Sequence, residues 1–333
     1  MTTAAQQYKI PMLVFGTLFL AWGLFGWIEI TNLAQGGYDT DGNNTVTQVL
    51  PGSPSEEAGL KVGDFVASVD GIATSDAEAL SNRPRPVVGE TRRFSVERDG
   101  ASMDIDITFG EPVAERQFLA HAGQFIGFCF LVFAFMAYLK RPSDVTLTLA
   151  FTGLCLAMAF LIGPYFESAT VRSAINALLN VIVFLGVGSL LHFLLLYPST
   201  HPFLSKPNAK LMLYAPALVA GLFLAYRVIV TPAATSGLNT FTNILTGAVI
   251  VFYLLGSLVR IFNTYRSASV EERSSKGINL MLIGTLIALG PVMISSLVGI
   301  FSPQTVLPGE NYYSLTVVLL PITWSIAAMR TEA

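Results

Sequence analysis

Charged residues are scarce in this sequence. Of its 333 residues only 12% are charged, whereas 53% are hydrophobic, and the mean hydropathy is +0.60. A typical soluble domain contains about 25% charged residues. The shortage of charge excludes a fully soluble protein and indicates a chain that lies largely within a membrane.

Histidine is scarce as well. The three histidines are His121, His192 and His201, and none belongs to an HExxH sequence, so the ligands of an intramembrane metalloprotease are missing. Ser189 lies three residues before His192, but such a pair on one helix is not a catalytic dyad without a further group that orients the histidine. Neither a phosphate-binding glycine loop nor a pair of axial haem ligands stands out. We therefore expect no enzyme activity, no metal and no cofactor.

Cysteine is nearly absent. Cys129 and Cys155 lie near the middle of apolar runs, and the most highly charged part of the chain contains neither. No disulfide framework is possible with this distribution. Thiols in such surroundings usually behave as small apolar side chains, so we expect a packing role for both.

Ionisable side chains are almost absent from the interior of the apolar runs. Residues of this kind inside a bilayer usually mark function, yet only His192 lies clearly within a run. A structural hydrogen bond is its favoured role, and a polar site or switch is the alternative. Without intramembrane charge pairs or an internal repeat, transport is disfavoured. Gly290 and Pro291 form the best candidate for a flexible break in a span, because proline removes a helical N–H.

Long apolar runs are what the sequence has in abundance. A bilayer core of roughly 30 Å needs a helix of about 20 residues, and a backbone exposed to lipid must satisfy its own hydrogen bonds. The sequence thus predicts eight membrane-spanning helices, the first of them an uncleaved anchor. They cover residues 11–30, 118–139, 145–163, 175–197, 211–230, 241–262, 278–301 and 313–329.

Lysine and arginine are distributed unequally between the two sets of helix ends. Ten basic residues lie on one side, and only Arg172 and Arg227 lie on the other. Because basic residues accumulate in cytoplasmic loops, we expect both termini in the cytoplasm. The ten are Lys9, Lys140, Arg141, Lys206, Lys210, Arg260, Arg266, Arg273, Lys276 and Arg330.

A charged segment, residues 31–117, interrupts the apolar runs after the first one. It holds 15 acidic and seven basic residues, a balance of −8, and the orientation places it outside the cytoplasm. Recognition of nucleic acid or of an anionic membrane surface needs basic patches. The segment is therefore not a nucleic-acid binder. The chain divides into an anchor (1–30), this external domain (31–117) and a seven-helix module with a short cytoplasmic end (118–333).

The external segment contains the signals of a small α+β domain. Pro51 to Pro54 forms a turn, Gly59 is a natural helix stop, and Asp70-Gly71 and Asp99-Gly100 favour hairpins. Alternating and β-prone residues predict strands, and a capping box at Ser75 predicts a second short helix. The strands are expected at 45–50, 65–69, 94–98 and 103–109, and the two helices at 55–58 and 75–81. Together they predict a partly open β-barrel with two helices.

The order PGSP, AGL, KVGD and VDG between Pro51 and Gly71 resembles the PDZ family, in the form found in bacterial periplasmic proteases and sensors. The resemblance extends over residues 35–109. It implies that a peptide adds as a strand beside the second helix, which would be lined by Ala77 and Leu80. Backbone N–H groups of a glycine loop would hold its terminal carboxylate. The matching loop in this chain is Gly36-Gly37-Tyr38.

The whole chain, with one span, an external PDZ domain and seven further spans, resembles the sensor half of bacterial signalling proteins such as competence-pheromone receptor kinases. The sequences HFLLLYP at 192–198 and LLPITWSIAAMR at 319–330 carry this likeness. In those proteins an ATP-binding output domain follows, whereas this chain ends at Ala333. The resemblance implies a bacterial inner-membrane protein that acts by contact.

Three functions remain open at this point. The preferred one is a non-enzymatic receptor or tether, whose external domain binds a peptide or protein segment and whose helices contact a membrane partner. The second is an accessory subunit of a larger membrane complex, in which the PDZ domain is a lid without a ligand. The third and least favoured is a hydrolase embedded in the membrane.

Overall fold

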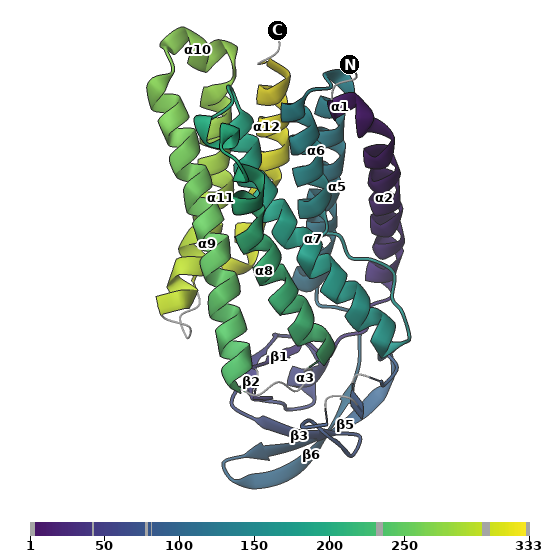
Figure 1. Cartoon of the computed structure of the whole chain (residues 1–333). Helices are drawn as coiled ribbons and strands as arrows, with labels where there is room; N and C mark the ends of the chain where they lie inside the picture. The colour runs from purple at the N-terminus through teal and green to yellow at the C-terminus, as the bar shows by residue number, and fades with distance from the viewer. Residues whose placement is uncertain are drawn as a thin grey trace.

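The computed structural model describes residues 4–41, 43–76, 79–80, 82–230, 236–301 and 307–330. It has two parts, a bundle of long helices and a domain rich in β-strands (Figure 1). The two chain termini lie at one end of the bundle, and the β-rich domain lies at the opposite end (Figure 1).

The bundle consists mainly of long apolar helices. Within the described ranges, seven segments are long and apolar enough to cross a bilayer, which makes this a multi-span membrane protein. They are α2 (Lys9–Thr31), α5 (Ala114–Lys140), α7 (Ala169–Leu196), α8 (Ala209–Val230), α9 (Ser236–Ser267), α11 (Ile278–Phe301) and the pair formed by the 3₁₀ helix η2 (Glu310–Val318) with α12 (Leu319–Arg330). The shorter helices are α1 (Ala4–Gln7), α6 (Asp144–Ala157), η1 (Pro202–Ser205) and α10 (Val270–Ser275).

The prediction of eight full-length spans was wrong at residues 145–163. Helix α6 ends at Ala157 after 14 residues, and the chain continues to the start of α7 without regular helix. The chain still passes from one end of the bundle to the other here, because α5 ends and α7 begins at opposite ends (Figure 1). Gly163-Pro164 opposes continuation of the helix, since proline disfavours helical backbone in the residue before it.

The side chain of Gln124 on α5 compensates for the lost helical hydrogen bonds. Its Oε1 accepts the N–H of Ile162 at 2.8 Å, and its Nε2 donates to the carbonyls of Ile162 and Gly23. Gly26 lets α2 approach the same segment, since a Cβ there would lie 1.6 Å from the Ile162 oxygen. Non-helical backbone at membrane depth is tolerated when protein groups satisfy it, and the buried amide of Gln124 supplies two such bonds, both to Ile162.

The centre of the bundle is an aromatic and aliphatic core shared by α5, α6, α7, α11 and α12. Trp324 stacks on Phe193 with ring centroids 4.9 Å apart, and its indole N–H donates to Thr285 Oγ1 at 2.8 Å. A buried tryptophan needs such a partner for its N–H. These contacts join α12 and α11 to α7 on the inside of the bundle.

The β-rich domain contains two sheets and a helical turn. Strand β1 (Tyr38–Thr40) pairs with β2 (Val46–Val49), and the second sheet has the order β4 (Ile72–Ala73), β3 (Phe65–Val69), β5 (Thr91–Arg98), β6 (Ala101–Thr108). Single bridges from Thr45 to Phe65 and from Gln35 to Gly110 link the sheets into a partly open barrel. The helical turn is α3 (Pro54–Glu57).

The barrel encloses its own hydrophobic core and has the predicted hairpins. Asp70-Gly71 and Asp99-Gly100 all have positive φ, which is the backbone of tight turns between antiparallel strands. Alternate residues of β5 and β6 point inward, as a period of two requires. The hydrophobic core of the whole domain consists of Ala34, Val46, Leu60, Val66, Phe94, Val96, Ile105, Ile107 and Phe109.

Candidate functional site

The Gly36-Gly37 loop lies against the turn that contains the PGSP sequence. The carbonyl of Gly36 accepts the N–H of Ser55 at 2.9 Å, and that of Gly37 accepts the N–H of Leu50 at 2.8 Å. Ser53 caps α3 by accepting the N–H of Glu56 and also donates its hydroxyl to the Gly37 carbonyl. The sequence motif that marks the domain therefore holds the candidate loop in place.

Only glycine fits at position 37. Its φ is +82°, and a Cβ there would lie 2.2 Å from the Cβ of Ser53. A residue with a side chain would face both the steric cost of positive φ and this contact. At Gly36 a Cβ would lie 3.0 Å from the Tyr38 ring and 3.1 Å from Ser55 Oγ, so that position is also tight.

The N–H groups of this loop are available. Among the residues that the structure describes, neither Gly36 nor Gly37 donates its backbone N–H to a protein acceptor. Both residues are buried, and buried N–H groups without a partner are rare in folded proteins. Successive backbone N–H groups in such a turn form a concavity suited to an anion.

Strand β1 presents an open edge beside this loop. In the described part of the chain β1 pairs with β2 alone. The Gly37 carbonyl and the Asp41 N–H both bond on the β2 side, so by alternation the groups of Tyr38 and Thr40 point to the other edge. A free edge of this kind can accept a further strand.

The other predicted site residues lie in different surroundings. The ring of Tyr38 packs edge-on against Phe94 at 5.6 Å within the barrel core, and burial raises the pKa of its hydroxyl. Ala79 and Leu80 are helical, and the carboxylate of Asp76 accepts the N–H of Ala79 at 3.0 Å. Glu78, a member of the capping box predicted from Ser75, lies outside the described residues. Ala77 lies outside the described residues.

Two sets of contacts connect the domain to the bundle. Asp39 of β1 forms an ion pair with Arg116 in the first turn of α5. Arg85 pairs with Glu29 at the end of α2 at 3.2 Å and stacks on Tyr165 with its guanidinium 4.8 Å from the ring centroid. Arg172 of α7 covers the same ring at 5.2 Å. Strand β1 is thus tied to a membrane-spanning helix by one of its own side chains.

A buried ion pair stabilises the far side of the domain. Asp64, the aspartate of the KVGD motif, is 1% exposed and accepts two hydrogen bonds of 2.7 Å from Arg98 of β5. It also accepts the N–H of Lys61 at 2.8 Å. The hydrogen bonds from Arg98 hold the pKa of the Asp64 carboxyl below its usual range.

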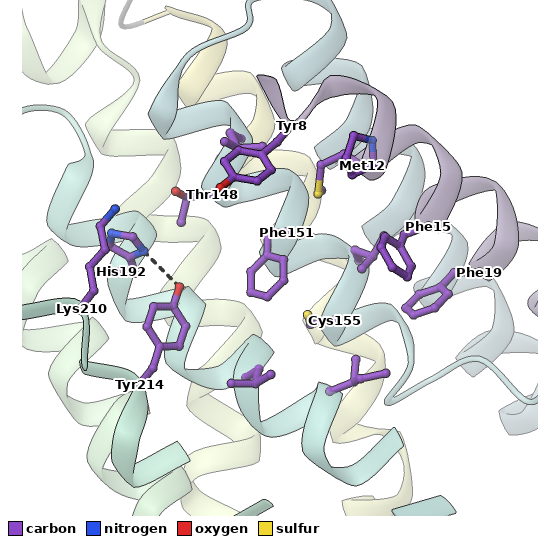
Figure 2. Close-up of a pocket in the computed structure, with 15 residues that line it drawn as sticks. Tyr8, Met12, Phe15, Phe19, Thr148, Phe151, Cys155, His192, Lys210 and Tyr214 are labelled. Carbon is purple, nitrogen blue, oxygen red and sulfur yellow. Dashed lines mark hydrogen bonds between the residues drawn. The ribbon is translucent and has the colours of Figure 1, made fainter. Parts of the chain in front are cut away.

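His192, the predicted polar site in the bundle, is 7% exposed and forms a hydrogen bond from Nδ1 to the Tyr214 hydroxyl at 3.0 Å. Figure 2 shows this pair at one end of a groove of about 620 Å³ that is mostly lined by apolar side chains. Ser189 bonds instead to the Thr152 hydroxyl at 2.7 Å. The described structure contains no hydrogen bond between the serine and the histidine.

At Gly290-Pro291, where the sequence predicts a flexible break, the described backbone is helical. Helix α11 continues through both residues, and no atom lies within 4 Å of a Cβ placed at Gly290. Pro291 cannot donate to the carbonyl four residues before it. The next carbonyl, that of Ala288, accepts the Thr316 hydroxyl at 3.0 Å.

Metal-ligating groups do not converge in the described ranges. No set of three or more histidine, cysteine, aspartate or glutamate side chains there could hold an ion. The two cysteines are buried and unpaired.

Comparison with known proteins gives a match to the PDZ domain family over residues 45–83. The chain is also 32% identical over 108 residues to a protein of Ectopseudomonas mendocina named as a DegP-like periplasmic serine endoprotease. It is 31% identical over 86 residues to a protein of Lactococcus lactis named as a zinc metalloprotease. These matches cover 29% and 26% of this chain and 22% and 20% of the relatives, so the chain spans about a fifth of their length.

Proposed function

We propose that this multi-span membrane protein with a PDZ domain is a non-enzymatic receptor or tether. Its domain binds a peptide or protein segment, and its helix bundle contacts a membrane partner. The observation that carries the proposal is the open edge of β1 next to the free N–H groups of Gly36 and Gly37. An added strand would extend the sheet, and the loop would hold its terminal carboxylate.

The contacts of β1 support a role in which the two parts communicate. Asp39 lies between the two edge residues Tyr38 and Thr40 and pairs with Arg116 of α5. The neighbouring Glu115 is within hydrogen-bond distance of Asn311 in η2 at 3.4 Å. A ligand seated on β1 would therefore act on α5 and η2 through two polar contacts. This arrangement is compatible with the sensor-like architecture that the sequence resembles.

The non-enzymatic part of the proposal draws on the lack of a hydrogen bond between Ser189 and His192 among the described residues. The proteases to which the chain is similar match it over 108 and 86 residues, about a fifth of their own length, and their activities are not assigned to this chain. In the proposed orientation both termini are cytoplasmic and the domain is external, which agrees with their opposite positions in Figure 1 and with the ten basic residues on one side.

Strand addition can be tested with the full chain in nanodiscs. Peptides selected from a random library with free C-termini would be labelled and titrated by fluorescence anisotropy. Thr40→Pro removes an N–H from the open edge, and proline is tolerated on edge strands. Thr40→Val keeps the N–H and is the matched control. We expect Thr40→Pro to weaken binding about tenfold or more, because a backbone hydrogen bond and the fit of the strand are both lost.

Further outcomes separate the proposal from its alternatives. Amidation of the peptide C-terminus should also weaken binding if the loop holds a carboxylate. Equal affinities for Thr40→Pro and Thr40→Val would contradict strand addition. If no peptide is selected, and a stoichiometric partner from native membranes is retained by Thr40→Pro, the domain is a lid of an accessory subunit. Peptide cleavage by the purified chain that is lost in His192→Ala would instead show a hydrolase.

A further inference from the structure

The groove around His192 is distinct from the PDZ domain and extends along the spanning helices. Figure 2 shows side chains of α2 on one side, His192 and Tyr214 of α7 and α8 on the other, and Phe151 of α6 between them. Its volume of about 620 Å³ lies within the range of small-molecule sites, roughly 300–1,000 Å³. Tyr8 and Phe15 are both 51% exposed, so the groove opens to the surroundings of the bundle.

The length of the groove corresponds to one leaflet of a bilayer. Along α2 it extends from Tyr8 to Phe19, and along α7 from His192 to Ile182. At a rise of about 1.5 Å per residue each distance is roughly 15 Å. The apolar core of a bilayer is roughly 30 Å thick. The groove therefore reaches from one membrane face to about the middle of the membrane.

The polar residues of the groove gather at the end that lies at the membrane face. Tyr8 directly precedes α2, Lys210 is the second residue of α8, and His192 is in the last turns of α7. No carboxylate in the described ranges forms an ion pair with the exposed Lys210. Asp144 begins α6 near His192. The rest of the lining is apolar or aromatic apart from Thr148 and the thiol of Cys155.

We infer that this groove binds a phospholipid of the leaflet on the side of the chain termini. One acyl chain would lie against Phe15, Phe151 and Leu185, and its anionic phosphate would lie at Lys210 near the His192–Tyr214 pair. Three features select this occupant: the groove is as deep as one leaflet, its body is apolar, and its only positively charged side chain lies at headgroup level. The site is separate from the proposed peptide site and does not depend on it.

Native mass spectrometry of the full chain in detergent tests this inference. Phosphatidylglycerol, phosphatidylcholine and palmitate would each be titrated separately. We expect one tightly retained phosphatidylglycerol per chain and weaker retention of phosphatidylcholine. Lys210→Gln should reduce phosphatidylglycerol affinity about fivefold, which is the contribution of one lysine near an anionic lipid surface. Leu185→Trp fills the groove and should abolish retention of both lipids.

Two control variants test whether the effects of Lys210→Gln and Leu185→Trp are specific to the groove. Lys140→Gln removes an exposed lysine at the same face from α5, and Leu222→Trp enlarges an exposed residue of α8 outside the groove. Both should bind as the wild type does. Phosphatidylglycerol with a photoreactive acyl chain should label peptides of α2 and α6. Equal retention in Leu185→Trp, tighter binding of palmitate than of phospholipid, or labelling confined to other helices would overturn the assignment.

Discussion

The external domain and the helix bundle satisfy their buried polar groups in different ways. In the domain, guanidinium groups pair with carboxylates, as in Arg98 with Asp64 and Arg92 with Glu90. In the bundle, buried neutral side chains bond to backbone carbonyls, and the half-buried Arg260 bonds to the carbonyls of Leu194 and Tyr197 without a carboxylate partner among the described residues. The neutral bonds include those of Gln124 to Gly23 and Ile162, Tyr138 to Ala5, Tyr197 to Lys276, and Tyr253 to Leu213.

The difference follows from the solvent around each part. A charge in hydrocarbon is costly unless it is paired and hydrogen-bonded, whereas a neutral donor needs a single acceptor. Water at the surface of the domain lowers the desolvation cost of paired charges there. The stability of the bundle should therefore fall when a neutral hydrogen bond is lost and should change little with pH. The stability of the domain should depend on pH, because its buried polar groups include charged pairs.

The largest effect is expected in the bundle, from Gln124→Leu. This change leaves the N–H and the carbonyl of Ile162 without their side-chain partner in an apolar interior. Each such group costs about 1–3 kcal/mol, so we expect a loss of roughly 4 kcal/mol in stability. The measurement is the thermal midpoint of the detergent-solubilised chain. Gln117→Leu, at a half-buried position in the first turns of α5, is the control and should change it little.

A small loss in Gln124→Leu would mean that water or lipid headgroups satisfy the segment after α6. That outcome would weaken the contrast between the two parts. Hydrogen exchange at residues 158–163 would then be fast even in the wild type, whereas we expect protection there that the variant loses.

This segment also shows what the sequence could predict about the fold. Seven of the eight predicted spans correspond to helices that are long and apolar enough to cross a bilayer. The length of the apolar runs was sufficient to predict them, because a bilayer requires helices of a minimum length. Residues 145–163 are also apolar, yet only 13 of them, 145–157, are in α6. The decisive partner, Gln124, is about 38 positions away, and hydropathy contains no information on such a contact. Gly163-Pro164 and a glutamine within a span were the available signals.

The candidate site in the domain shows a similar limit. Strands β3, β5 and β6 and both Asp-Gly turns agree with the predictions from alternation and turn residues. Strand β1, on which the proposed function depends, is only three residues long, and its sequence Tyr-Asp-Thr has no strong β pattern. Its existence follows from pairing with β2 and from the Gly37–Leu50 hydrogen bond. The proximity of Asp39 to Arg116, 77 positions later, likewise needs the three-dimensional structure.

The second prediction compares two glycines of the domain that have nearly the same φ. Gly37→Ala combines the cost of φ +82° with a contact at 2.2 Å, whereas Gly89→Ala has φ +88° and open space around the new Cβ. Positive φ costs about 1–2 kcal/mol and overpacking about 1–3. We expect losses of roughly 3 kcal/mol for Gly37→Ala and about 1 kcal/mol for Gly89→Ala, measured by hydrogen exchange of β5 peptides in the full chain.

Equal losses for the two glycines would show that Ser53 moves aside and that the loop is not rigidly held. The bundle should be unaffected by either change, since both glycines lie in loops of the β-rich domain. A change in exchange of α7 peptides in both variants would show that the domain and the bundle unfold together.

The smallest effect is expected from the Asp64–Arg98 pair and depends on pH. The folded-state pKa of Asp64 is lowered, chiefly by its hydrogen bonds from Arg98, relative to an ordinary value of about 3.9. A group with a depressed folded pKa contributes stability above its unfolded pKa, and this contribution is lost as the pH falls through the folded value. The wild-type domain should therefore lose protection of β3 and β5 as the pH falls below about 4. Asp64→Asn should be destabilised by about 2 kcal/mol at pH 7, because charged hydrogen bonds are lost.

Asp64→Asn should also show a flatter dependence on acid than the wild type, because the group that titrates is gone. Asp106→Asn is the matched control, since its pair with Arg93 is exposed and exposed pairs contribute little. The α12 peptides, in which the Trp324 indole bonds to the neutral Thr285 hydroxyl, should keep the same exchange rates from pH 7 to pH 4 after correction for the chemical rate. A bundle that loosens with acid as early as the domain would contradict the division between charged and neutral pairing.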